Sequence, residues 1–356
     1  MAQKRTVAVD ARHMVSGIGT YLRNLLPEMI AQSDWGWRLI GPPELKGLAE
    51  TWPGRVSWIH CQDPIYTVGE HLKVAKLAKG ADLLWVPQYN APLLWRGALV
   101  VTLHDLIHRM PAYTPPGLKQ KIGGWLMGSA LRRATRVITV SAYSKQKIRE
   151  YFPYAADKTV VIHNGVQSPP ALGGTPPLDV PYVLSFGNAL PHKNFPRLIE
   201  AFMKVKSEVP EHLVIAGPAG RDLPRMEELA RSSGGRIHLM GLQKGPEWAR
   251  LVRNARLYVC PSLEEGFGLP PLEALSVGVP VACSRSASLP EILGDAAIWF
   301  DPRSVPEMAM AIVTGLTDAT VRAKVVDVGR TRLSLFTWQA SAQRHLEVFR
   351  EVLQSS

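Results

Sequence analysis

PSLEEGFGLPPLEALSVGVP, residues 261–280, is the stretch that decides the fold. The apolar, β-branched run before it, residues 255–260, predicts a buried strand that ends in a loop carrying Glu265. The pair Pro270–Pro271 suits the first turn of a helix, where a missing N–H costs nothing. Gly278 then marks the end of that helix. A strand, a glycine-rich loop and a helix in this order are typical of a parallel α/β sheet.

The loop also has the chemistry of an anion site. Gly266 and Gly268 stand where a backbone approaches a ligand closely or adopts φ > 0. The N–H groups of Gly268 and Leu269 would point out of the helix N-terminus, which favours an anion. Glu273 follows Glu265 by eight residues, so two carboxylates flank the predicted site. A phosphate with hydroxyl groups on both sides, as in a nucleotide sugar, fits this pattern.

From Pro261 to Ala274 the chain resembles the E-x7-E motif of retaining glycosyltransferases of family 4, P-S-x-x-E-G-F-G-L-P-x-L-E-A, at every fixed position. The resemblance implies the GT-B fold, in which two doubly wound Rossmann-like domains face a cleft. It implies that Glu265 binds the donor sugar and Glu273 the ribose, with Phe267 inside the donor-binding motif. Without its flanks, a pair of glutamates eight apart would be an ordinary corner with solvated carboxylates.

Length and composition set wider limits. The length of 356 residues predicts two domains. The composition, with 46% hydrophobic residues and a mean hydropathy of −0.01, is typical of a soluble protein. No apolar run approaches the length of a membrane span, and the first ten residues lack the apolar core of a signal peptide. The three cysteines form no C-x-x-C pair, which favours a reducing compartment, and so the cytoplasm.

The positive charge is concentrated in the first half of the chain. Residues 1–173 carry 21 Lys and Arg against 11 Asp and Glu, whereas residues 174–356 carry 20 against 19. A basic half suggests an anionic partner, either nucleic acid or the inner face of the plasma membrane. Plain solubilising charge explains the same balance equally well.

Short apolar runs alternate with helical patterns along the whole chain, which predicts two domains of crossover-connected parallel strands. The boundaries we expect are 1–166 for the acceptor-side domain, 167–181 for a Pro- and Gly-rich linker, and 182–337 for the nucleotide-sugar domain. The resemblance implies that a terminal helix, about 338–356, packs back on the first domain. Ligands should bind at the carboxyl ends of the strands.

Two strand ends in the first domain carry candidate residues. Gly17 and Gly19 precede a helical pattern and would let a phosphate approach it, although a simple turn explains them as well. Gln88, Tyr89 and Asn90 follow an apolar strand, where they would either line an acceptor pocket or cap the loop.

His104 follows another apolar strand, and a histidine in that place is usually structural. The family carries V-H-D or V-x-D here, which implies that His104 reaches the transferred sugar. Residues 117–136 place basic ends around an apolar, aromatic centre. This pattern fits either a core helix with solvated ends or a segment at an anionic membrane surface.

In the second domain a predicted strand ends at Gly187, and a loop then delivers Lys193 and Asn194. Lysine at such a corner is well placed as a point charge for a pyrophosphate. The family pattern matches at Lys193 and Asn194, but Asn188 stands where many members have arginine. Gly241 and Leu242 end a further strand, and the resemblance implies that their backbone reads a base edge.

The sequence contains no D-x-D motif and no His/Cys cluster with metal spacing, so we expect neither a metal nor another cofactor. By resemblance the reaction is retaining glycosyl transfer, with His104, Lys193 and Glu265 as catalytic residues. GDP-mannose is the expected donor and a lipid-linked saccharide the expected acceptor, as in O-antigen mannosyltransferases. The alternatives are another GT-B enzyme, namely a nucleotide-sugar epimerase or a sugar phosphorylase, and a non-catalytic nucleotide- or nucleic-acid-binding protein.

Overall fold

The computed structural model describes residues 5–14, 16–62, 67–114, 117–171, 177–217 and 219–355. The chain forms two compact units, one of Met1–Gly165 with Thr337–Ser356 and one of Val166–Phe336. Each unit is built on a single sheet in which all paired strands are parallel. The prediction of two doubly wound α/β domains is confirmed.

The first unit has a seven-stranded sheet with the order β3-β2-β1-β4-β5-β6-β7. Its strands are β1 (Thr6–Asp10), β2 (Gly36–Gly41), β3 (Val56–His60), β4 (Leu83–Val86), β5 (Ala98–Leu103), β6 (Arg136–Thr139) and β7 (Thr159–Val161). The order reverses beside β1, because β2 continues on one side of it and β4 on the other. Such a reversal is the usual ligand position of an open parallel sheet.

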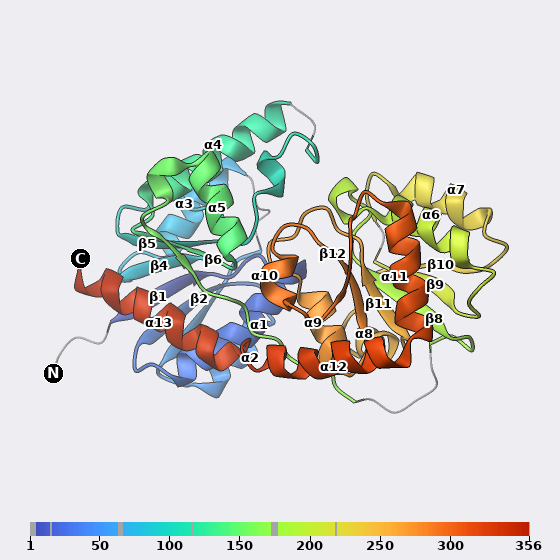
Figure 1. Ribbon diagram of the computed structural model, residues 1–356. Helices are drawn as coiled ribbons and strands as arrows, with labels where there is room; N and C mark the ends of the chain where they lie inside the picture. The colour runs from blue at the N-terminus through green and yellow to red at the C-terminus, as the bar shows by residue number, and fades with distance from the viewer. Residues whose placement is uncertain are drawn as a thin grey trace. The chain divides into compact units, whose positions relative to one another are not determined.

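Helices cover both faces of this sheet. They are α1 (Ser16–Ala31), α2 (Leu45–Thr51), α3 (Val68–Leu77), α4 (Leu118–Arg133), α5 (Ala142–Tyr151) and α13 (Trp338–Gln354), with the short turns η1 (Ile107–Arg109) and η2 (Pro153–Ala155). Figure 1 shows α1 and α13 on one face of the sheet and α3, α4 and α5 on the other.

Successive residues of each strand point to opposite faces of the sheet. Val7 and Val9 of β1 join the core beneath α1 and α13, whereas Ala8 between them joins the core on the opposite face. This alternation explains why the strands read as almost uninterrupted apolar runs. Helix α13 packs directly along α1, so the end of the chain completes the core of the first unit.

The second unit has a six-stranded sheet with the order β10-β9-β8-β11-β12-β13. Its strands are β8 (Tyr182–Phe186), β9 (His212–Ala216), β10 (Ile237–Met240), β11 (Leu257–Cys260), β12 (Val281–Ser284) and β13 (Ile298–Phe300). Its helices are η3 (Pro191–Lys193), α6 (Phe195–Val205), α7 (Leu223–Arg231), α8 (Gly245–Arg253), α9 (Leu269–Ser276), α10 (Leu289–Leu293), α11 (Val305–Thr317) and α12 (Ala319–Leu333). Residues 261–280 therefore comprise the β11–α9 loop, α9 and the link to β12, beside the order reversal at β8 and β11.

The expected linker, 167–181, lies partly outside the described residues, which omit 172–176. Its beginning is held to the second unit, because the guanidinium of Arg253 donates to the carbonyl oxygens of Pro169 and Pro170 at 3.1 and 3.0 Å. In the described part of the chain, every helix is too short or too polar to cross a bilayer.

Candidate active site

The carboxylate of Glu265 forms the centre of the predicted donor site in the second unit. Strand β11 delivers it into the loop, where its Oε1 accepts hydrogen bonds from Lys193 Nζ at 2.6 Å and from Ser262 Oγ at 2.7 Å. Burial raises the pKa of Glu265, but the charge and hydrogen bond of Lys193 and the bond from Ser262 outweigh it, so the pKa is lowered. Two residues that the sequence placed on neighbouring strand ends thus form one ion pair.

Lys193 reaches this position because Gly187 has no side chain. A Cβ on Gly187, whose φ is 149°, would lie 3.2 Å from Lys193 Cε. Asn188, in the place of the family's arginine, is exposed. Of the two positions where the family pattern has a basic residue, Lys193 therefore supplies a cation and Asn188 does not.

Asn194 holds the site together from within. Its backbone adopts the left-handed conformation at φ 60°, and its buried side chain donates to the carbonyl oxygens of Pro261 and Pro302 at 3.0 and 2.8 Å. The Asn194 oxygen accepts from Arg197 at 2.8 Å. The residue joins the β11–α9 loop to η3 and has no side-chain surface left for a ligand.

The N-terminus of α9 has the predicted geometry for close approach. Gly268 has φ 93°, and a Cβ there would lie 2.7 Å from Leu289 Cδ2. Phe267 turns inward and packs edge-on against Phe336, with ring centroids 5.5 Å apart. Because proline has no N–H, the backbone donors at this helix end come from Gly268, Leu269 and the loop before them.

Glu273 lies on α9 and is half-buried. Its Oε2 accepts a hydrogen bond from the indole N–H of Trp248, on α8, at 2.9 Å. Burial raises the pKa of Glu273 to about 7, and the indole bond acts in the opposite direction. Sequence reasoning missed Trp248, although an aromatic residue one turn into the helix after the predicted base loop was a usable signal.

The predicted base-reading residues, Gly241 and Leu242, are exposed at the end of β10. Gly241 O and Met240 O both accept from the N–H of Gly217, which ties this loop to the end of β9. Thus Gly187, Gly241 and Glu265 all follow the carboxyl ends of strands in one sheet.

In the first unit, Gly17 and Gly19 lie within α1, which begins at Ser16, and not in a loop before it. Gly17 is open to solvent, with no atom near its Cβ position, whereas a Cβ on Gly19 would collide with the carbonyl of Met14. Gly19 is needed for packing at the start of α1, and Gly17 leaves that start accessible.

Gln88 and Asn90 are buried, with exposed fractions of 2% and 1%. The amide of Asn90 donates to Glu70 Oε1 at 2.5 Å, so it faces the protein and not a ligand. Tyr89 between them is partly accessible and packs edge-on against His108, with ring centroids 6.2 Å apart. Of the three predicted acceptor residues, Tyr89 is the one that the structure leaves for contact.

A buried ion network lies under that loop. The guanidinium of Arg12 forms two bonds of 2.8 Å with Asp10 and one of 2.9 Å with Glu70. Glu70 also closes a capping box with Thr67 at the start of α3. The sequence contains both parts, an aspartate that ends the first strand two residues before Arg12 and the spacing T-x-x-E, but it does not show that they pair.

His104 follows β5 and is partly buried. Its Nε2 lies 3.1 Å from the carbonyl oxygen of Pro87 and, as the donor there, carries the proton. Its ring packs edge-on against Tyr21, with centroids 4.8 Å apart. Burial lowers the pKa of His104 more than Asp105 and Pro87 raise it, which makes the neutral imidazole the form at pH 7.

Behind His104, the hydroxyl of Tyr21 lies 2.5 Å from Nε2 of His345 on α13. His345 is fully buried, and its Nδ1 donates to the Ser341 carbonyl at 2.7 Å. Burial lowers the pKa of His345 to about 4. The last helix therefore supports the strand end that carries His104, a link that sequence reasoning did not find.

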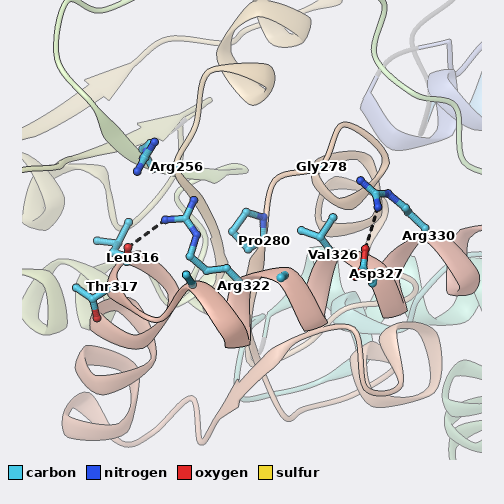
Figure 2. A pocket seen from close by; sticks show the side chains of 11 residues that line it. Arg256, Gly278, Pro280, Leu316, Thr317, Arg322, Val326, Asp327 and Arg330 are labelled. Carbon is cyan, nitrogen blue, oxygen red and sulfur yellow. Dashed lines mark hydrogen bonds and ion pairs between the residues drawn. The ribbon is translucent and has the colours of Figure 1, made fainter.

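A pocket of about 480 Å³ lies at the opposite edge of the second sheet, beside Arg256 and Pro280, which precede β11 and β12. Figure 2 shows two interactions among its lining residues: Arg322 donates to the Leu316 carbonyl and Arg330 pairs with Asp327. This pocket is separate from the carboxyl edge that holds Glu265. Across the described ranges, no three His, Cys, Asp or Glu side chains gather as a metal site.

The model of "Glycosyl transferases group 1" matches residues 174–332, and that of "Glycosyltransferase Family 4" matches residues 15–168. O-antigen chain mannosyltransferase B of Escherichia coli is 30% identical over 267 residues, covering 70% of this chain and 70% of that protein. Serotype-specific mannosyltransferase WbdA of Escherichia coli is 28% identical over 291 residues, which are 76% of this chain and 35% of that longer protein.

Among solved structures, Anabaena HepE in complex with UDP-glucose superposes with a TM-score of 0.75 at 19% identity, over 98% of this chain and 100% of that one. A glycosyltransferase from Rickettsia africae superposes with a TM-score of 0.74 at 19% identity, over 99% and 100%. The expected fold, two Rossmann-like domains of GT-B type, is confirmed.

Proposed function

Because this chain belongs to glycosyltransferase family 4, we propose that it is a retaining enzyme of surface polysaccharide synthesis. It moves mannose from GDP-mannose to a hydroxyl group of a lipid-linked saccharide. The donor and acceptor are suggested by the O-antigen mannosyltransferases to which the chain is similar. The observation that carries the proposal is the carboxyl edge of the second sheet, where Lys193, Glu265, Glu273 and the start of α9 follow neighbouring strands.

Each part of this edge has a role in the proposed reaction. The ammonium of Lys193 and the N–H groups of Gly268 and Leu269 stabilise the charge that develops on the leaving diphosphate. Glu265, whose lowered pKa keeps it ionised, accepts hydrogen bonds from the donor sugar hydroxyls. Glu273 does the same for the ribose, and backbone groups at Gly241 and Leu242 meet the base.

Lys193 is bonded to Glu265 at 2.6 Å, so its charge is partly compensated. A diphosphate would share the ammonium with this carboxylate, which holds the cation in position. With that cation and a helix N-terminus available, the proposed reaction needs no divalent ion.

The bond changes are those of a same-face substitution at the anomeric carbon. The acceptor oxygen forms the new glycosidic bond, the bond from the anomeric carbon to the phosphate oxygen breaks, and the leaving phosphate takes the acceptor proton. In the first unit we assign His104 to contact with the transferred sugar or the acceptor, as a neutral hydrogen-bonding group. We assign Tyr89 to the acceptor because its side chain is partly accessible. The buried side chains of Gln88 and Asn90 support the loop that carries it.

Transfer itself is the test of this proposal. Radiolabelled GDP-mannose and UDP-glucose would be incubated separately with the protein and lipid-linked oligosaccharides extracted from bacterial membranes. We expect label from GDP-mannose in the lipid fraction, equimolar release of GDP, and an α linkage. Conversion of the donor to an isomer without acceptor, or its cleavage only in the presence of inorganic phosphate, would instead support the epimerase or the phosphorylase.

We also propose that the first unit binds an anionic membrane surface, the cytoplasmic face of the plasma membrane, through α4. Leu118, Ile122 and Trp125 recur at helical spacing and are 73%, 49% and 61% exposed. The opposite side of the helix, including Met127 and Leu131, is buried in the core. An exposed apolar stripe with tryptophan on a basic unit suits a bilayer interface.

Vesicle flotation tests this surface. We expect binding to phosphatidylglycerol-containing vesicles that weakens in high salt, and roughly 10-fold weaker binding of Trp125→Ser, in line with the burial of one large apolar side chain. Met310→Ser, which changes an equally exposed residue of the second unit, is the matched control and should bind normally. Wild-type protein that stays with the unbound fraction, or a Trp125 variant that floats like the control, would contradict the assignment.

A further inference from the structure

Trp248 occupies a specific place beside the proposed ribose site. It lies on α8, the helix that follows the predicted base-reading loop, and its ring packs against Phe186 at the end of β8, with centroids 4.6 Å apart at 44°. Its indole N–H donates to Glu273 Oε2 at 2.9 Å. One side chain thus connects the end of β8 to the carboxylate on α9.

We propose that Trp248 is a positioning residue for nucleotide binding: its indole N–H fixes the orientation of Glu273 and stabilises the ionised carboxylate that accepts hydrogen bonds from the ribose. This inference rests on the proposed donor site and extends it to a residue outside the E-x7-E motif. Because Oε2 is bonded to the indole, Oε1 is the oxygen that would accept hydrogen bonds from ligand hydroxyls.

The charge balance at Glu273 makes such support necessary. Burial raises the pKa of this carboxyl to about 7, so a large part of it is protonated at neutral pH. The indole bond favours the ionised form and lowers the pKa. Removal of the N–H would therefore raise the pKa further and leave less carboxylate at pH 7.

The pKa of Glu273 is set by its burial and by the indole hydrogen bond, and not by the other charged groups around it. Helix α9 packs against α8, α12, β11 and β12. Tyr258 of β11 is the titratable group coupled to Glu273, and burial together with both site glutamates keeps its pKa well above the range of interest, so its phenol stays neutral. The remaining charged or thiol groups on these elements are Glu247, Arg250, Arg253, Cys260, Cys283, Arg322, Lys324, Asp327, Arg330 and Arg332.

The test compares Trp248→Phe, which keeps an aromatic ring against Phe186 but has no N–H, with the wild-type protein. Binding of GDP-mannose is measured by calorimetry from pH 6 to 9. A nucleotide sugar is the better probe than a free diphosphate, because its diphosphate is a diester that does not titrate in this range. We expect about 10-fold weaker binding at pH 7, as for one hydrogen bond to a charged group, with most of the loss recovered at pH 9.

Three further variants make the result specific. Trp299→Phe loses a comparable indole bond, to the Gly294 carbonyl at 3.1 Å, and should bind like wild type at every pH. Glu273→Gln should bind weakly with no pH dependence from this site. In the Glu273→Gln background, Trp248→Phe should add little, because the two side chains act as one unit.

A uniform loss of affinity across the pH range would mean that Trp248 contributes packing alone, and unchanged affinity would mean that it contributes nothing; either result overturns the inference. Normal binding by Glu273→Gln would remove the ribose role of that carboxylate. Failure of wild-type protein to bind any nucleotide sugar would instead contradict the proposed function, so the two failures are distinguishable.

Discussion

At the scale of single residues, Lys193 is the cation on which the proposed chemistry depends. Lys193→Ala should lower turnover roughly 100-fold, because one preorganised charge near the leaving diphosphate is lost. Lys204→Ala, an exposed lysine on the following helix, is the control and should keep full activity. Initial rates at saturating donor give the comparison, and a near-native rate for Lys193→Ala would show that the diphosphate is held elsewhere.

Asn194 illustrates a residue that supports the site from inside. Asn194→Ala should reduce the free energy of unfolding by about 1–3 kcal/mol, because two buried carbonyl groups lose their donor and alanine fits a φ of 60° poorly. Asn188→Ala changes an exposed asparagine earlier in the same loop and should leave the free energy of unfolding within about 0.5 kcal/mol of the wild-type value. Urea denaturation measures both, and equal stabilities would contradict the role we give to Asn194.

Residue roles were predicted from the sequence only where the motif itself names the residue. Lys193 and Glu265 were both singled out, but their 2.6 Å ion pair was not, because it joins residues from different strand ends. The sequence allowed Gln88 and Asn90 either to line an acceptor pocket or to cap the loop, and the structure buries both. A strand-end motif shows which residues leave the sheet, whereas the direction in which each side chain turns depends on tertiary partners such as Glu70.

At the scale of elements, α9 depends on Gly268 at its start. Gly268→Ala would place a Cβ at φ 93° and 2.7 Å from Leu289, so we expect a loss of about 1–3 kcal/mol in stability and weaker nucleotide binding. Gly241→Ala has open space at its Cβ and should remain as stable as wild type. Thermal unfolding of the two variants side by side provides the measurement. An alanine tolerated equally at both positions would argue against a strained helix start.

Helix α13 carries a titration that is visible in stability. Burial lowers the pKa of His345 to about 4, below the ordinary value of 6.5, so the unfolded chain binds the proton more tightly than the native one. The contribution of the neutral His345 to the free energy of unfolding is complete above pH 6.5 and is lost as the pH falls towards 4. Lowering the pH from 7 to 5 should cost about 2 kcal/mol through this group.

His345→Gln should show a shallower loss of stability than wild type between pH 7 and 5, although it is less stable at pH 7 because the bond with Tyr21 changes. Chemical denaturation at both pH values gives the two slopes. Parallel slopes would mean that His345 is not the group that titrates.

The elements themselves were largely predictable. In the described part of the chain, short parallel strands alternate with helices as expected, and β11 lies within the predicted run 255–260, because strands buried on both faces are recognisable by composition alone. Helix α1 was the exception, since its two glycines suggested a loop where the structure begins the helix at Ser16. Glycine near a helix start is compatible with a loop and with the first turn of the helix. The close packing of Gly19 on Met14 favours the helix.

At the scale of the whole molecule, two parallel sheets and a terminal helix in the first unit give the GT-B fold, and the family models and the 30% identical relative give the family. The sequence motif indicated the family and fold, but the support given by Trp248 to Glu273 and by His345 to Tyr21 depends on the assembled elements. The excess of positive charge in residues 1–173 agrees with the membrane surface proposed for α4, since an anionic bilayer attracts such a unit.

The proposed function depends on the second sheet holding a nucleotide-diphosphate sugar without a metal. Its most direct test is the melting temperature of the protein with GDP, UDP, ADP and dTDP and their sugars, in the presence of a chelator. At a ligand concentration 100 times its Kd, binding adds about 2.7 kcal/mol, which gives a clear shift. We predict a shift with GDP and GDP-mannose that Glu273→Gln and Lys193→Ala both reduce; a folded protein whose melting temperature none of these compounds changes would contradict the claim.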